Sequence, residues 1–149
     1  ITPGRIDVFA PRPVDGTGVR VASFTVPQCL NGPVGLALGP AQHLIGACDT
    51  GAALVGLHNG SFEKLIPNVG GADEIWFNPG DRNVYLARLL PTLQGQLGVG
   101  DAVSGRFLQN LPTGLLAHSV AAYAGNNHIF VPVSGGGIQV FQSSGDPGS

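Results

Sequence analysis

An internal repeat of about 40 residues is the feature that most constrains how this chain of 149 residues can fold. Three segments align on the apolar residues Leu36, Ile75 and Val120, which are 39 and 45 residues apart. Each aligned residue is followed, eight or nine positions later, by a second apolar run. Gly, Pro, Asn or Asp lies between the two runs, where the chain must reverse. The pattern predicts three hairpins of short β-strands.

Each repeat continues beyond its hairpin. A third and a fourth apolar run follow at 53–57 and 62–66 in the first unit and at 97–101 and 106–111 in the second, whereas the third unit has one more run, 137–141. Four short strands with a period near 40 are typical of the blades of a β-propeller. Helical repeats would need longer amphipathic runs, which the sequence lacks. We therefore expect an all-β fold of four-stranded antiparallel blades in a partial ring.

The two ends of the chain carry the same blade element. Gly4–Phe9 matches Gly137–Phe141 closely, and 19–24 follows as a fourth strand. The prediction is a single partial propeller domain, 1–149, with blade boundaries near 31, 70 and 116 and a flexible tail over 142–149. Because a closed ring needs at least about four blades, we expect a second copy, or a chain carrying the missing blades, as partner.

Composition narrows the functional classes. Only 11% of the residues are charged, the net charge is −2, and Lys and Arg form no cluster, so a nucleic-acid partner is not expected. No apolar run approaches the roughly 18 residues of a membrane span. The 24 Gly and 12 Pro are spread along the chain, as expected for short strands joined by tight turns.

The two cysteines, Cys29 and Cys48, bear on the compartment. An even cysteine count in a Gly-rich all-β chain indicates an exported protein with one disulfide. Two buried free thiols are the alternative. We expect the disulfide, and with it a secreted or periplasmic location.

Several motifs resemble a known family. The segments 70–81, 117–122 and 129–133 resemble the C-terminal part of secreted YVTN-type, lactonase-like β-propellers, and 32–38 resembles the blade starts of NHL-repeat and gluconolactonase-type propellers. The resemblance runs from about Arg5 to Phe141. It implies the propeller fold and the blade order, and it implies chemistry only weakly, because many such proteins have no assigned activity.

Candidate site residues lie where the innermost strands begin, at the mouth of a propeller's channel. The aligned positions there are Val34, Asp73 and His118, and Glu74 follows Asp73. Asp73, Glu74 and His118 form the predicted ligand-binding set. Carboxylates suit a divalent cation such as Ca²⁺, and the gluconolactonase likeness would make Asp73 and Glu74 its ligands.

Two functions follow from these expectations. The first is a non-catalytic secreted propeller that acts as a scaffold or binds a protein, a glycan or a small molecule. The alternative is a metal-dependent, lactonase-like hydrolase, in which a cation at the channel mouth polarises a carbonyl and activates water. Convergence of Asp73, Glu74 and His118 would favour the hydrolase.

Overall fold

Four antiparallel β-sheets follow one another along the chain in the computed structural model, which describes residues 3–11 and 18–144. The first sheet contains β1 (Pro3–Pro11) and β2 (Gly18–Leu30). The second sheet contains β3 (Leu36–Leu38), β4 (His43–Ala47), β5 (Gly51–Gly56) and β6 (Phe62–Pro67). The third sheet contains β7 (Glu74–Asn78), β8 (Asn83–Leu89), β9 (Gln94–Asp101) and β10 (Phe107–Leu115). The fourth sheet contains β11 (Ala121–Tyr123), β12 (His128–Val133) and β13 (Gly137–Gln142).

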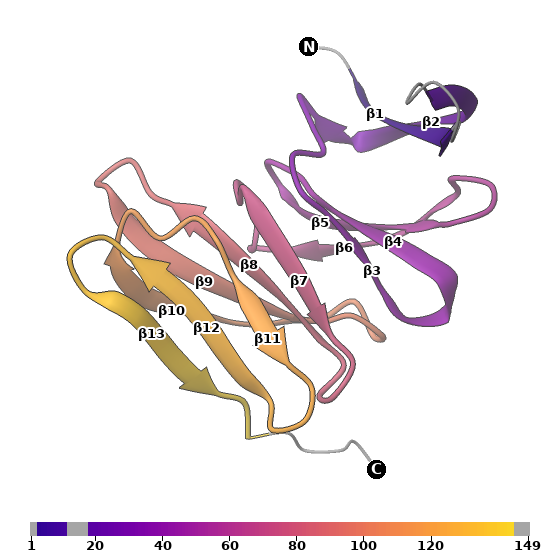
Figure 1. Ribbon diagram of the computed structural model, residues 1–149. Helices are drawn as coiled ribbons and strands as arrows, with labels where there is room; N and C mark the ends of the chain where they lie inside the picture. The colour runs from indigo at the N-terminus through magenta and orange to yellow at the C-terminus, as the bar shows by residue number, and fades with distance from the viewer. Residues whose placement is uncertain (1–2, 12–17, 145–149) are drawn as a thin grey trace.

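Every sheet is a meander in which neighbours in sequence are neighbours in space. The sheets succeed one another from β1–β2 to β11–β13, and the innermost strands β3, β7 and β11 lie next to one another in that order (Figure 1). In the part of the chain described, the only helical element is one 3-10 turn, η1 (Pro40–Gln42), in the β3–β4 connection. The all-β fold of four-stranded antiparallel blades in a partial ring is confirmed.

The strand register reproduces the repeat seen in the sequence. Leu38 pairs with Leu44, Phe77 with Val84, and Ala122 with Ile129, so each pair lies two residues beyond an aligned residue. Val120 itself lies one residue before β11, whereas Leu36 and Ile75 lie within β3 and β7. The difference is small, because strand ends vary by a residue or two with local pairing.

The core consists of three layers, each between two successive sheets. Alternate side chains of a strand point to opposite faces, so Ile45 and Leu54 of the second sheet pack towards the third, while Ala53 and Val55 pack towards the first. Tyr85 of the third sheet packs towards the fourth. The third sheet is therefore buried on both faces, and so is the second sheet except at its inner strand β3, as propeller blades are.

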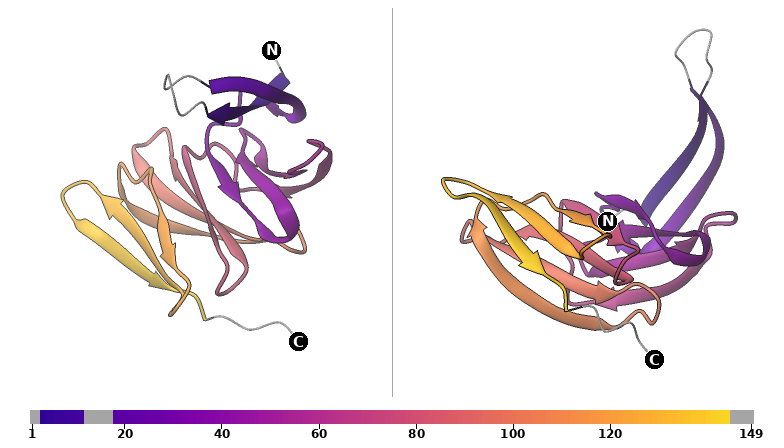
Figure 2. Two further views of the ribbon diagram at one scale, coloured as in Figure 1. Left: turned by 45° about the vertical axis from the view of Figure 1, so that its right-hand side comes forward. Right: turned by 60° about the horizontal axis from the view of Figure 1, so that its bottom comes forward.

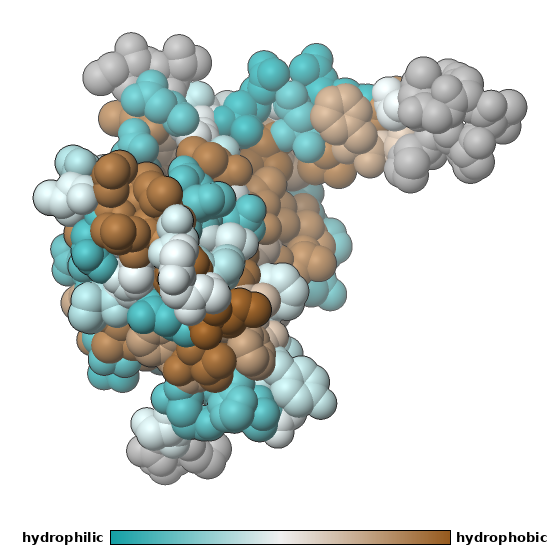
Figure 3. Space-filling view, turned by 60° about the vertical axis from the view of Figure 1, so that its left-hand side comes forward, coloured by the Kyte–Doolittle hydropathy of each residue, from teal (hydrophilic) through white to brown (hydrophobic). Residues whose placement is uncertain are grey.

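Two surfaces are left partly bare: the inner strand of the second sheet, on the side of the first sheet, and the outer face of the fourth sheet. Leu36 of β3 is 48% exposed, whereas the aligned Ile75 and Val120 are 6% and 4% exposed. On the fourth sheet, Ile138 and Val140 are 64% and 55% exposed, and hydrophobic side chains gather on that side of the molecule (Figure 3). Aligned positions thus differ in burial according to whether a further sheet covers them.

A disulfide joins the first sheet to the second. Cys29 in β2 and Cys48, directly after β4, are bonded across 19 residues of sequence, with 4.9 Å between their Cα atoms. Both are almost completely buried in the layer between these sheets. The predicted disulfide is confirmed.

The β1–β2 hairpin projects from the body of the molecule (Figure 2) and carries a polar network. Asp7 accepts a 2.6 Å hydrogen bond from Ser23 and lies 3.0 Å and 3.8 Å from the guanidinium groups of Arg5 and Arg20. The hydrogen bond, followed by the two positive charges, lowers the pKa of the Asp7 carboxyl against the opposing effect of desolvation. The hairpin is therefore polar at this network and apolar where Ile6 and Val26 meet the second sheet.

Within residues 3–11 and 18–144, no helix has the length and apolar character needed to cross a membrane. The predicted flexible tail, 142–149, lies outside the described residues from 145 onwards, and its first residue, Gln142, is the last of β13.

Candidate functional site

The predicted channel-mouth residues lie at the beginnings of the inner strands. Asp73 immediately precedes β7, Glu74 is its first residue, and His118 lies between β10 and β11; all three are exposed. The backbone N–H of Asp73 donates to the Ala87 carbonyl at 3.2 Å, and that of Val34 donates to the Ala47 carbonyl at 3.0 Å. The matching hydrogen bonds show that Val34 and Asp73 occupy the same position in successive sheets.

The second and third sheets approach each other closely at this point. A Cβ atom on Gly35 would lie 2.8 Å from the carbonyl oxygen of Asp73 and 3.2 Å from the Ile75 side chain. A residue with a side chain would therefore push the two inner strands apart. Gly35 brings the start of β3 against the start of β7.

The three predicted side chains do not form a ready-made metal centre. Among the described residues, no group of three or more His, Cys, Asp and Glu side chains is arranged to hold a metal ion. His118 lines a cavity of about 310 Å³ with Ser119 and Ser134, and neither Asp73 nor Glu74 lines that cavity. Ligand binding by Asp73, Glu74 and His118, and a cation such as Ca²⁺ on the two carboxylates, stay predictions.

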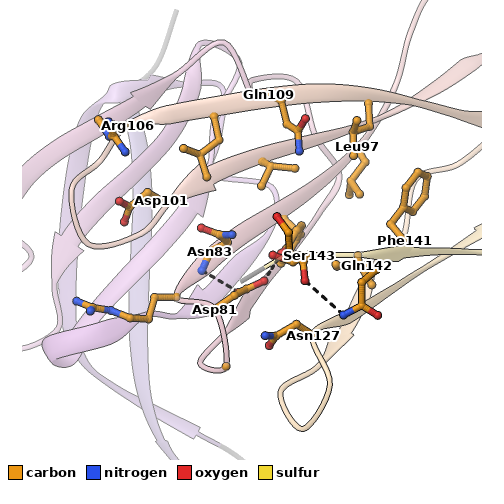
Figure 4. Close-up of a pocket in the computed structure, with 18 of the residues that line it drawn as sticks. Asp81, Asn83, Leu97, Asp101, Arg106, Gln109, Asn127, Phe141, Gln142 and Ser143 are labelled. Atoms are coloured by element: carbon orange, nitrogen blue, oxygen red, sulfur yellow. Dashed lines mark hydrogen bonds between the residues drawn. The ribbon is translucent and has the colours of Figure 1, made fainter. Parts of the chain in front are cut away.

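A larger groove, of about 800 Å³, lies between the third and fourth sheets. Its floor includes Leu97 and Leu111 from β9 and β10, and Phe141 of β13 borders it. Figure 4 shows Gln109 and Leu97 on one side, Phe141 and Gln142 on the other, and polar side chains at one end. The groove thus combines an apolar floor with a polar end.

Tyr85 and Asp81 occupy part of the polar end. The Tyr85 hydroxyl donates to the Asp81 carboxylate, which also accepts the backbone N–H of Asn83 at 3.1 Å. Burial, and then the hydrogen bond to Asp81, raise the pKa of the Tyr85 phenol to about 12. The phenol is therefore a neutral donor across the physiological range.

Asp101 organises the adjoining β9–β10 turn. Its carboxylate accepts the backbone N–H groups of Val103 and Ser104 at 2.8 Å and 3.0 Å, and the Ser104 hydroxyl at 2.5 Å. Desolvation by itself would raise the pKa of the Asp101 carboxyl. The hydrogen bonds from Ser104 and Val103 and the charge of Arg106 together outweigh desolvation, so the pKa of Asp101 is lowered. Asp101 is thus a charged residue that holds the turn.

A hydrogen bond between sheets fixes the groove beside Asn127. The fully buried Asn78 donates through its amide to the side-chain oxygen of Asn127 at 3.1 Å, joining the β7–β8 turn to the β11–β12 turn. The Asn78 side-chain oxygen accepts the N–H of Gly80 at 3.2 Å. The two turns are therefore held in a defined relation at the border of the groove.

Sequence reasoning did not identify the groove. Its lining comes from strands and turns of both sheets, and most of those residues are ordinary strand residues. Among the described residues the fourth sheet has three strands, and the outer strands of the third sheet are left partly uncovered beside it.

The repeated meanders, packed face to face around adjacent inner strands, define a protein of the β-propeller class. Comparison with solved structures supports this assignment. Dihydro-heme d1 dehydrogenase NirN in complex with DHE matches 92% of this chain with a TM-score of 0.60 and 16% identity. Hydrazine synthase of Kuenenia stuttgartiensis matches 91% with a TM-score of 0.63 and 11% identity. Both are β-propeller proteins.

These likenesses concern the fold alone, because the identities are low. The matched region spans 30% of the first protein's chain and 47% of the second's. The sequence matches no protein-family model, and no curated protein matches it. The comparisons therefore support a propeller-like fold and leave the YVTN-type or lactonase-like kind as a prediction.

Proposed function

We propose that this chain is a non-catalytic propeller module that binds polypeptide through the uncovered faces of its blades. One observation carries the proposal: Leu36 is 48% exposed, whereas Ile75 and Val120, which are aligned with it, are 6% and 4% exposed. The aligned position is buried in the two sheets where a neighbouring blade covers it. An apolar side chain that is exposed at the same position is therefore suited to packing against another blade. The proposal concerns binding and assigns no reaction to the chain.

The two uncovered faces are of the kind that associating proteins present. Val34 and Leu38 add to the exposed apolar surface around Leu36, and Tyr123 adds to that of Ile138 and Val140. Contiguous apolar surface of this sort marks interaction sites in soluble proteins. The polypeptide that covers it is a second copy of the chain or a chain that carries further blades, and the interface should exceed about 1,000 Å².

The disulfide supports an oxidising compartment for the module. The buried bond between Cys29 and Cys48 is of a type that persists in oxidising environments. We place the module outside the cell or in a periplasm on this ground.

The proposal is tested by the mass of the protein in solution. We expect sedimentation equilibrium at about 50 μM to give a mass above the 15.2 kDa of one chain, because the exposed apolar faces should associate at micromolar concentrations. The double substitution of Leu36→Lys with Leu38→Lys should reduce the mass towards one chain.

Leu93→Lys is the matched control, because Leu93 is 55% exposed in the β8–β9 connection and belongs to neither face. It should leave the mass unchanged. A wild-type chain that sediments at 15.2 kDa and binds no apolar dye would contradict the proposal.

A further inference from the structure

We propose that the groove between the third and fourth sheets, together with the free edge of β13, binds an extended strand of a partner polypeptide. The inference deepens the proposed function and rests on it. It joins three observations: a strand edge that pairs with no further described strand, an apolar groove beside that edge, and the equivalent place between the second and third sheets, which shows what lies there.

The edge of β13 has its backbone groups arranged for pairing. Among the described residues β13 pairs with β12 alone. The Ser143 N–H donates to the Asn127 carbonyl at 3.0 Å, in register with the β12–β13 ladder. Hydrogen-bonded and non-hydrogen-bonded pairs alternate in an antiparallel ladder. The N–H and C=O groups of Ile138, Val140 and Gln142 therefore point away from β12, towards the free edge.

The groove provides the surface on which a strand at that edge would lie. Its floor is continuous with the core between the third and fourth sheets, because Leu97 and Val99 belong to both. Leu108 and Leu111 of β10 extend the apolar floor, and Leu108 is 40% exposed. A strand paired with β13 would cover these side chains.

The interface between the second and third sheets shows how the equivalent position is covered, because there the following sheet has a fourth strand, β10. Ile66 of β6 corresponds to Leu111 of β10, because each pairs with the residue of its third strand that faces the next sheet. Ile66 is fully buried, whereas Leu111 is only partly buried. A Cβ atom on Gly100 would lie 2.6 Å from Ile66, so the outer strands of the following sheet cover it directly.

A second correspondence strengthens the comparison. Lys64 and Gln109 occupy equivalent positions, opposite Leu54 and Val99. The Lys64 ammonium donates to the Val103 carbonyl, in the turn that leads into β10, at 2.9 Å. Gln109 lines the groove and offers an amide at the same place. Gln109 in the groove therefore corresponds to Lys64, the residue of the second sheet that forms a hydrogen bond with the turn before β10.

These correspondences define the occupant. It is an extended segment antiparallel to β13 that directs a large apolar residue into the groove, as Phe107 of β10 packs into the core between the second and third sheets. Binding would use the main chain for affinity and the groove for selection of side chains. The ligand is therefore a polypeptide strand rather than a small molecule.

The experiment uses a synthetic peptide with the sequence of residues 106–115, which contains β10. We expect the labelled peptide to bind the full chain with a Kd of about 50 μM in fluorescence anisotropy. The backbone amide resonances of Ile138, Val140 and Gln142 should shift. A peptide in which the residue corresponding to Phe107 is serine should bind at least about tenfold more weakly.

Val140→Pro removes one outward N–H and should weaken binding at least about tenfold, whereas Val140→Thr keeps the N–H and should bind within about twofold of the wild type. Proline is tolerated on an edge strand where its nitrogen faces outwards. If Val140→Pro nevertheless fails to fold, Leu108→Lys tests the groove without altering β13, and it too should weaken binding about tenfold.

No binding by the wild type up to about 1 mM, or equal binding by the wild type and a folded Val140→Pro or Leu108→Lys chain, would overturn the inference. That failure is separable from failure of the proposed function. Loss of association in the double Leu36 and Leu38 variant, combined with no peptide binding, would leave the proposed function standing and this inference refuted.

Discussion

Tyr85 shows how a single residue depends on the sheet that follows its own. It packs in the core between the third and fourth sheets and reaches the groove with its hydroxyl, which donates to Asp81. Its side chain thus belongs to the core and to the polar end of the groove together. Sequence alone marks it only as an aromatic residue of a second strand.

We predict that Tyr85 makes the stability of the protein sensitive to alkaline pH. Its pKa is about 12 in the folded chain and about 10 when unfolded, so its contribution is complete below pH 10 and is lost as pH rises towards 12. Two pKa units correspond to about 2.7 kcal/mol, and screening by solvent in the adjoining groove reduces this to about 1 kcal/mol.

Urea unfolding of the wild type and of Tyr85→Phe between pH 8 and about pH 12 measures this effect. The variant should lose about 1 kcal/mol at neutral pH with the hydrogen bond, and it should fall less steeply above pH 10. Tyr123→Phe, at an exposed tyrosine, is the control and should keep the wild-type profile. Parallel pH profiles for the wild type and Tyr85→Phe would show the assignment to be wrong.

At the scale of the element, the β1–β2 hairpin is the part of the described fold with the least packing against its neighbours. It is a two-stranded sheet, and such sheets are marginal in isolation. It is held by the small core around Ile6 and Val26 and by the disulfide from Cys29 to Cys48. The covalent bond compensates for the small area of packing.

We predict that replacing both cysteines, as Cys29→Ala with Cys48→Ala, lowers the free energy of unfolding by about 3 kcal/mol. The reason is that the bond closes a loop of 19 residues and so restricts the unfolded chain. Denaturant unfolding monitored by circular dichroism gives the value, and reduction of the wild type should reproduce it. Equal stability of the oxidised and reduced proteins would be incompatible with this role.

At the scale of the whole molecule, stability should vary from sheet to sheet. Each sheet contacts mainly its neighbours, so the stack resembles a linear array of repeats. The third sheet is packed on both faces, and the second is packed on both faces except at its inner strand β3. The first and fourth sheets are packed on one face each among the described residues.

We predict that amide hydrogen exchange is slowest in β8 and β9, at the centre of the third sheet. Exchange there should be at least about tenfold slower than in β12 and β13, because local opening needs less free energy where fewer apolar contacts are broken. Exchange measured by mass spectrometry after proteolysis resolves these strands. Uniform protection across the sheets would instead indicate that they unfold as one unit.

Much of the architecture could be predicted from local sequence signals. Leu36, Ile75 and Val120 stand in a repeat, and turn residues separate the apolar runs, so strand number, order and pairing follow from local conformational preferences. The pairing of Cys29 with Cys48 could also be expected, because no other cysteine competes.

The candidate site depended on tertiary structure. Asp73 and Glu74 lie at the start of β7 and His118 lies three residues before β11, but only the structure placed His118 in a cavity with Ser119 and Ser134. The larger groove also escaped prediction, since residues more than 30 positions apart, such as Leu97 and Phe141, meet there. Local conformational preferences decide which segments become strands. The burial of a side chain depends instead on whether a neighbouring sheet covers its face. For that reason Leu36 and Ile75, which are aligned in the repeat, differ in solvent exposure in the folded chain.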